Sequence, residues 1–292
     1  MVEKKRIRRA NLILTGLIGV FGAVFLWLTI RSGRADSALL FVVLPTVVAG
    51  ALALTPGATT HGRVFRLTTI GLLLAAVALH EGAVCVVLAA PLVYGVAHAV
   101  TAVAGSVRES RRLPALIPLP LLLLGVEGTD PQWRINPDQT VEVTRVITAD
   151  PATVPALLTA GPQPAGPRSV PLRLLGVPTP EHVHGAGLAA GDRWTFGYHG
   201  SSHGPGGQIV TEVTGAAPGE LEFRVVEDSS ITGRWVDLRD ATLSWRAVPG
   251  GTEVTVRIDY RRGLDPSWYF GPLQDGLMHA GAGHLLDMLD LQ

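Results

Sequence analysis

The sequence predicts an N-terminal α-helical transmembrane bundle followed by a C-terminal α+β domain, in which a curved antiparallel sheet surrounds a long C-terminal helix. Three observations predict this class. Residues 11–126 hold several apolar runs near the length that crosses a bilayer. Strand-length segments with alternating apolar residues follow from residue 140, and an amphipathic segment closes the chain over 265–292. We therefore expect a transmembrane region over 1–126 and a soluble domain over 135–292.

The composition excludes several classes of protein. Of the 292 residues, 47% are hydrophobic and 16% are charged, and 24 Lys and Arg balance 24 Asp and Glu. So apolar a chain is neither intrinsically disordered nor an ordinary cytosolic enzyme, and its zero net charge predicts no nucleic-acid partner. The single cysteine, Cys85, excludes an intrachain disulfide and a cysteine-based zinc site.

The first apolar run follows a basic N-terminus. Five Lys and Arg residues lie within Met1–Ala10, and the uncharged run Asn11–Ile30 comes next. At about 20 residues the run can cross a bilayer, and it exceeds the roughly 7–15 residues of a removable signal-peptide core. We expect an uncleaved anchor helix, with a signal peptide as the alternative.

Further apolar runs predict a multi-pass integral membrane protein. The expected spans lie near 11–30, 37–55, 65–81, 83–105 and 113–126. Residues 67–105 are too many for one crossing at about 1.5 Å per residue, and the polar break His80-Glu81-Gly82 predicts a turn. The last run is short and holds three prolines, so a bundle of four spans is the alternative.

The arginines predict the orientation in the membrane. Five spans place the N-terminal cluster on the same side as Arg63, Arg66, Arg108, Arg111 and Arg112. By the positive-inside rule this side is the cytoplasm, so five spans put the soluble domain outside it and four would keep it inside. His80, Glu81 and His98 can form a proton or substrate path, but we favour solvated positions for them.

The soluble half begins with a strand and a helix. Residues 140–147 alternate strictly, and Asp150-Pro151 predicts a short helix to about Ala160. Six prolines in 161–180 predict a loop with one helical turn near 172–175.

An antiparallel sheet and a helix complete the soluble half. Strand-length segments follow at Arg193–His199, Gly207–Thr214, Glu220–Glu227, Leu238–Ala247 and Thr252–Arg261, with a further short strand near Ile231–Trp235. Pro218-Gly219 and Pro249-Gly250-Gly251 predict two of the turns. Asp265-Pro266 predicts the start of a helix that continues to Gln292, with Asp265 as its cap.

Three segments carry a resemblance to a known family. They are residues 140–154, residues 243–256 with their Gly-Gly-Thr turn, and residues 263–273. In this order they resemble the START-related helix-grip superfamily (SRPBCC, polyketide cyclase/dehydrase and lipid transport), and the third is similar to the helix start of membrane-attached members. The resemblance implies a cavity between sheet and closing helix, with a hydrophobic small molecule or a lipid as the partner.

Apolar residues at alternating positions are the candidate ligand-binding residues. Trp194, Phe196 and Tyr198 share one face of a strand, and two later strands repeat the pattern. In the closing helix, Phe270, Leu273, Leu277, Gly281, His284 and Met288 share a face. We expect ligand contacts from Trp194, Phe196, Tyr198, Phe223, Val256, Tyr260, Leu277 and His284. Plain core packing predicts the same spacing.

The remaining chemistry-bearing residues give weaker signals. His182, His184, His199 and His203, with Glu181, have residue types that bind zinc, but we favour solvated loop histidines and expect no metal and no cofactor. Nothing in the spacing of Tyr198, Arg224, Asp240 and His284 brings them together, so no catalytic residue is assigned.

The sequence therefore predicts membrane-tethered binding or transfer of a hydrophobic small molecule or lipid. A cyclase- or dehydratase-type enzyme acting on an apolar substrate in the same cavity is one alternative. A non-catalytic structural or regulatory module that binds a protein partner is the other.

Overall fold

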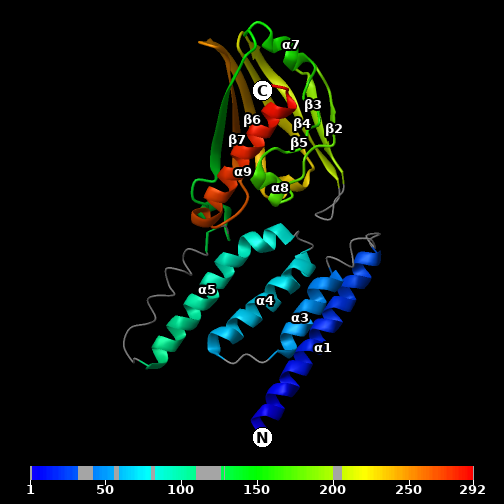
Figure 1. Cartoon of the computed structure of the whole chain (residues 1–292), viewed down its shortest axis with the longest axis vertical. Helices are drawn as coiled ribbons and strands as arrows, with labels where there is room; N and C mark the ends of the chain where they lie inside the picture. The colour runs from blue at the N-terminus through cyan, green and yellow to red at the C-terminus, as the bar shows by residue number, and fades with distance from the viewer. Residues whose placement is uncertain are drawn as a thin grey trace. The chain divides into compact units, whose positions relative to one another are not determined.

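The computed structural model describes residues 2–31, 42–55, 59–79, 83–109, 126–127, 129–199 and 206–291. The chain divides into two compact units, Met1–Leu124 and Gly125–Gln292 (Figure 1).

The described residues of the first unit form four helices: α1 (Val2–Arg31), α3 (Leu44–Leu54), α4 (Thr60–Leu79) and α5 (Ala83–Glu109). Each helix contacts the next one along the chain. Ile18, Ala49, Ala53 and Ile70 form a small buried cluster between them. Most large apolar side chains of α1 point outward instead, among them Leu17, which is 63% exposed.

The helices of the first unit differ in length and hydropathy. By these two measures Arg9–Arg31 and Thr60–Ala78 can cross a membrane, whereas the apolar helices Leu44–Leu54 and Val86–Ala102 are shorter. The predicted turn at 80–82 and nearly all of the predicted span 113–126 lie outside the described residues. His98 of α5 lies beside His61 of α4, with their Nδ1 atoms 3.0 Å apart.

The second unit is built on one antiparallel sheet. Its elements are η2 (Pro131–Trp133), β1 (Asp138–Ile147), α7 (Val154–Thr159), α8 (Val170–Leu174), β2 (His182–His184), β3 (Arg193–Tyr198), β4 (Gly207–Ala217), β5 (Glu220–Asp228), η3 (Ile231–Arg234), β6 (Val236–Val248), β7 (Gly251–Arg262) and α9 (Ser267–Met288). The seven strands lie in the order β1-β7-β6-β5-β4-β3-β2, so the first strand pairs with the last. This order, with its long C-terminal helix, fits the helix-grip domain that the sequence resembles.

Turns and bulges shape the sheet. The predicted turns are confirmed, because Pro218-Gly219 joins β4 to β5 and Pro249-Gly250 joins β6 to β7. Gly219 and Gly250 have φ angles of 83° and 96°, which favour glycine. Register shifts interrupt the β4–β5 pairing at two places and the β6–β7 pairing at one. Bulges of this kind bend the strands and increase the local twist of the sheet.

Helix α9 lies across one face of the sheet and contacts β1, β7 and α8 (Figure 1). Ala282, Leu286 and Met288 belong to the same buried cluster as Trp194 and Phe223 of the sheet. Each large apolar side chain buried in this way stabilises the fold by about 1.5–3 kcal/mol. The core of the second unit therefore lies between the sheet and the C-terminal half of α9.

Four predictions about local structure are wrong. Residues 231–234 form the 3-10 helix η3 rather than a strand. His182–His184 forms an edge strand where we expected a loop, because its backbone pairs with β3. Asp265 does not cap α9, since its carboxylate pairs with Arg262 and Arg134. Leu273 is 38% exposed, so the buried face of α9 includes Gln274, Ala282 and Leu286 in its place.

Candidate functional site

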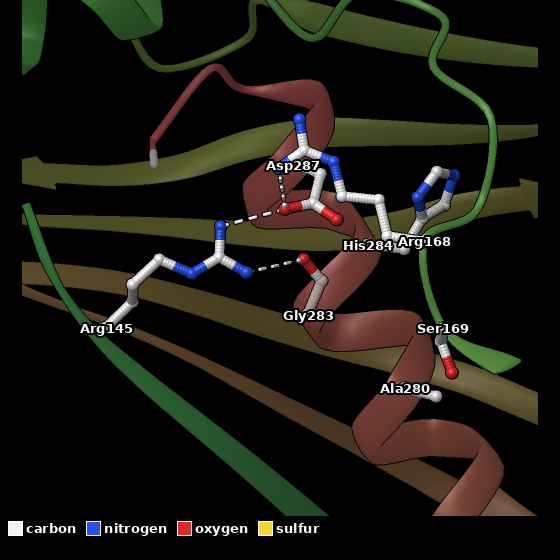
Figure 2. Close-up of a pocket in the computed structure, with 7 residues that line it drawn as sticks. All are labelled: Arg145, Arg168, Ser169, Ala280, Gly283, His284 and Asp287. Atoms are coloured by element: carbon white, nitrogen blue, oxygen red, sulfur yellow. Dashed lines mark hydrogen bonds and ion pairs between the residues drawn. The ribbon is translucent and has the colours of Figure 1, made fainter.

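A cavity of about 540 Å³ lies beside the C-terminal half of α9 (Figure 2). Its lining comes from one strand, one connecting segment and one helix: Arg145 of β1, Arg168 and Ser169 directly before α8, and Ala280, Gly283, His284 and Asp287 of α9. The volume falls within the range of roughly 300–1,000 Å³ that is common for small-molecule sites, and the cavity is wide open to solvent rather than enclosed.

Two arginines approach one carboxylate in this cavity. Arg145 Nη1 lies 2.9 Å from Asp287 Oδ1, and Arg168 Nη1 lies 3.9 Å from the same oxygen. Arg145 also donates to the carbonyl oxygens of Leu291 and Gly283, at 2.8 and 3.4 Å. Figure 2 shows the two guanidinium groups reaching Asp287 from different sides. The lining therefore carries two positive charges against one negative charge.

Arg168 differs from Arg145 in its surroundings. The Arg168 side chain is 64% exposed and that of Arg145 is 30% exposed, whereas Asp287 is only 10% exposed. The guanidinium of Arg168 can thus turn toward an anionic group in the cavity, while Arg145 holds β1 to α9.

His284 is a buried polar residue that makes no hydrogen bond within the described part of the chain. It is 7% exposed, and neither Nδ1 nor Nε2 has a hydrogen-bond partner among the described residues. Burial lowers the pKa of His284 from its ordinary 6.5, although the charge of Asp287 opposes this. A neutral imidazole carries one donor and one acceptor, and each buried group left unpaired costs about 1–3 kcal/mol. A partner that supplied the missing hydrogen bonds would therefore stabilise the buried ring.

Gly283 keeps the cavity wall open. Apart from its chain neighbours and the backbone of its own helix, no described atom lies within 4 Å of the position that a Cβ would take at Gly283. Glycine inside a helix costs up to about 1 kcal/mol relative to alanine, so this residue lowers helix stability while leaving space beside His284.

Exposed apolar side chains continue from the cavity along α8. Val170, which follows the lining residue Ser169, is 53% exposed, and Leu174 one turn later is 80% exposed. These two side chains give this short helix an exposed apolar surface next to a lining residue of the cavity.

The structure separates the predicted ligand-binding residues into two groups. His284 lines the cavity. Trp194, Phe196, Phe223, Val256 and Tyr260 are all buried in the hydrophobic core, and Tyr198 packs against it. Leu277 is half-buried on α9. Ligand contacts by these seven residues stay a prediction, and core packing explains the positions of the buried ones.

Burial raises the pKa of two tyrosines among the predicted ligand-binding residues. Burial raises the pKa of Tyr198, and the charge of Asp228 raises it further. Burial and Asp275 also raise the pKa of Tyr260, although Arg262 opposes them. Both phenols therefore stay protonated at neutral pH, so neither is suited to act as a base.

Arg145, Arg168 and Asp287 were missed by the sequence analysis. One signal was available, because Val141, Val143 and Arg145 alternate and so place an arginine on the apolar face of its strand. A second was the spacing of Ala280, Gly283, His284 and Asp287, which puts small and polar residues on one helix face. Arg168 gave no signal within its proline-rich segment.

The histidines at the other edge of the sheet lie outside this cavity. Glu181, His182 and His199 each present a ligand atom within 4.8 Å of the other two, and all three residues are exposed. His184 stacks on His182 with ring centroids 6.3 Å apart, and His203 lies outside the described residues.

Comparison with known proteins yields structural likeness only. No protein-family model matches the sequence, and no curated protein matches it. A protein of Thermus thermophilus is 17% identical, with 52% of this chain and 94% of that chain covered and a TM-score of 0.36. The AHSA1-like protein from Aeromonas hydrophila is 15% identical over 53% of this chain and 96% of its own, with a TM-score of 0.32. The ginseng major latex-like protein 151 from Panax ginseng is 14% identical over 51% and 99%, with a TM-score of 0.30. We base the fold assignment on the strand order and on α9, which fit a helix-grip domain.

Proposed function

We propose that this protein binds a hydrophobic small molecule or lipid with a polar end in the second unit, and that the helices of the first unit tether it to a membrane. One observation carries the proposal: the buried His284, with two unpartnered ring nitrogens among the described residues, lines a cavity of about 540 Å³. An unpaired polar group of this kind gains stability when a ligand supplies the missing hydrogen bonds.

The chemistry of the lining suggests which end of a ligand it takes. His284 can exchange hydrogen bonds with a hydroxyl, carbonyl or carboxyl group, and the exposed Arg168 favours a negative charge. Val170 and Leu174 offer apolar surface beside the cavity. A long-chain fatty acid has both features and is a suitable probe.

The tether is supported by the surface of the first unit. Arg9–Arg31 and Thr60–Ala78 are long and apolar enough to span a bilayer. Leu12, Ile13, Leu17 and Val20 of α1 are 55%, 64%, 63% and 64% exposed, a degree of apolar exposure that lipid accommodates better than water. A tethered binding domain would meet its apolar ligand at high effective concentration, since the membrane is the reservoir.

The binding proposal is tested with the full-length chain in lipid nanodiscs, titrated with a fluorescent long-chain fatty acid against empty nanodiscs. We expect saturable binding that weakens roughly 5- to 150-fold in His284→Leu, the equivalent of losing about 1–3 kcal/mol. The matched control is His279→Leu, because His279 lies on the same helix, is exposed and, among the described residues, pairs with Asp275 one turn away.

Two results would overturn the proposal. The first is wild-type protein that binds no more probe than empty nanodiscs, and the second is equal loss of binding in His284→Leu and His279→Leu. The five-span topology has its own test, in which a periplasmic-type reporter enzyme fused after residue 292 is active only if the second unit lies outside the cytoplasm. Activity of a cytoplasmic reporter at the same position would instead support four spans.

The packing of the second unit favours a second candidate. Trp194 and Phe223 lie with ring centroids 4.7 Å apart in a buried core that also holds Leu286 of α9. A solidly packed domain of this kind is typical of a structural or regulatory module. A structural or regulatory role would be supported if the wild-type protein binds no apolar probe but captures a defined protein partner.

A further inference from the structure

A second cluster of chemistry-bearing side chains lies at the β2 edge of the sheet, away from the residues that line the cavity. Glu181 directly precedes β2, His182 begins β2 and His199 directly follows β3. Each presents one metal-ligand atom, and the three atoms lie within 4.8 Å of one another.

Strand pairing brings these residues together. In the antiparallel pairing of β2 with β3, His182 lies opposite Gly197, and the Glu181 N–H donates to the Gly197 carbonyl at 3.0 Å. His199 lies two residues after Gly197, so it is the diagonal neighbour of His182 on the same face. The histidine ring centroids are 4.9 Å apart in an edge-on arrangement.

Gly197 makes this convergence feasible. It is the residue directly opposite His182, and a Cβ built there would lie 3.7 Å from the Cβ of His182. A larger side chain at this position would occupy the space between the two histidines. The glycine therefore leaves the outer face open at the point where His182 and His199 meet.

The donor atoms suit a transition metal. Without a metal, Nδ1 of His199 lies 3.0 Å from Oε2 of Glu181, the distance of an ion pair when the ring is protonated. A bound Zn²⁺ would replace that proton, since two ligands of a tetrahedral Zn²⁺ with bonds of about 2.0–2.1 Å lie roughly 3.3 Å apart. Imidazole and carboxylate ligands favour Zn²⁺, Cu²⁺ or Ni²⁺ over Mg²⁺. The His199 and Glu181 side chains are both 60% exposed, so water can complete the coordination.

We propose that Glu181, His182 and His199 form a site for a divalent transition metal, with zinc as the representative ion. The site joins the edge strand β2 to the end of β3, so a bound metal stabilises the pairing of a strand that has only three residues. The proposal is independent of ligand binding in the cavity, because the two sites share no residue.

The test uses the full-length protein in nanodiscs with any affinity tag removed, titrated with Zn²⁺ by calorimetry and with Co²⁺ by visible absorption. We expect one Zn²⁺ per chain and a Co²⁺ spectrum typical of four-coordinate nitrogen and oxygen ligands. His182→Ala and His199→Ala each weaken Zn²⁺ binding by at least about 10-fold. Glu181→Gln also weakens Zn²⁺ binding, but by a smaller factor. Mg²⁺ at the same concentration does not compete.

The matched control is His184→Ala, which removes a histidine from the same strand and the same face but outside the cluster. Its Zn²⁺ affinity stays within about 3-fold of wild type, which is less than about 1 kcal/mol. The proposal is overturned if wild-type protein takes up no Zn²⁺ at roughly 100-fold molar excess, or if His184→Ala weakens binding as much as His182→Ala. Circular dichroism of each variant confirms that the fold is retained, and a variant that does not fold is replaced by His182→Gln or His199→Gln.

Discussion

The buried polar side chains at the first turn of α9 and the buried His284 near its end differ in how they are paired. At the first turn, Arg262, Glu127 and Asp265 are 4%, 6% and 9% exposed, and Arg262 forms ion pairs with both carboxylates. Glu127 also accepts hydrogen bonds from the Ser267 N–H and hydroxyl, each at 2.8 Å. In the second half, His284 is as deeply buried but has no partner among the described residues.

This contrast separates a structural polar cluster from the site that we propose a ligand completes. Buried polar groups are nearly always paired, so an unpaired one needs an explanation. The network at the first turn needs no ligand, and it ties the segment that leads into the second unit to the start of α9. His284 is one of the residues that line the cavity, and our proposal is that a ligand there supplies its missing hydrogen bonds.

The largest effect is expected at the paired end. Glu127→Gln leaves Arg262 buried with only Asp265 as its negative partner, so we expect a loss of about 3 kcal/mol in the free energy of unfolding, at the low end of the range for broken buried pairs. Denaturant unfolding followed by tryptophan fluorescence measures this, because five of the six tryptophans lie in the second unit.

Glu253→Gln is the control for this measurement. Glu253 pairs with Arg246 on the surface, where the arginine side chain is 75% exposed, and such pairs contribute about 1 kcal/mol or less. Equal effects of the two substitutions would show that the first-turn network is not the stabilising element.

A smaller effect of opposite sign is expected at the unpaired end. His284→Leu removes two buried nitrogens that have no partner among the described residues, so the free energy of unfolding should rise by about 1–2 kcal/mol while ligand binding falls. Loss of both stability and binding would mean that His284 has a structural partner.

The pH dependence of stability distinguishes the two ends. Since the folded-state pKa of His284 lies below 6.5, the unfolded chain takes up a proton first, and stability begins to fall as the pH drops through 6.5. Burial alone would raise the pKa of Glu127, but hydrogen bonds from Ser267 and Ile135 and the charge of Arg262 lower it below 4.5. Its contribution is therefore complete above pH 4.5 and is lost as the pH falls through the lowered value. We would measure the free energy of unfolding from about pH 3 to 8. The loss of stability below pH 6.5 should be absent in His284→Leu, and the loss below pH 4.5 should be absent in Glu127→Gln.

The smallest effect is expected at Gly283. Gly283→Ala should stabilise α9 by up to about 1 kcal/mol, because alanine is the better helix former and no described atom obstructs its methyl group. The methyl group would enter the cavity, so probe binding should weaken. Gly276→Ala on the same helix has equal space and lies outside the cavity lining, so it should stabilise equally without affecting binding. Equal binding by both variants would place the ligand elsewhere.

Local patterns predicted most of the second unit. The alternation of apolar residues and the Pro-Gly turns located five strands from β3 to β7, because each depends on neighbours in sequence. They failed at η3, because four residues are too few to show a helical or alternating pattern. They also failed at β2, which is a strand because it pairs with β3. The helix-grip fold was predicted because the order of three sequence segments resembles that superfamily. The pairing of β1 with β7 then supported this prediction.

The candidate site was less predictable than the fold. His284 was found because it follows the spacing of the helix, whereas Arg145 and Arg168 meet Asp287 only through tertiary packing. The aromatic residues of β3 were expected to line a cavity, but period-two spacing describes a cavity wall and a packed core equally well. The Glu127–Arg262 pair joins residues 135 positions apart, and no sequence pattern links them.

The pairing of β1 with β7 also affects how the domain is made. Thr144 of β1 meets Thr255 of β7 across 111 residues of chain. At typical rates of synthesis, on the order of ten seconds pass between the two, and during that time the first strand has no partner of its own. A nascent chain is thus exposed to wrong strand pairing until its last hairpin is complete, and chaperones that shield unpaired strands would act on β1 before any other part of the sheet.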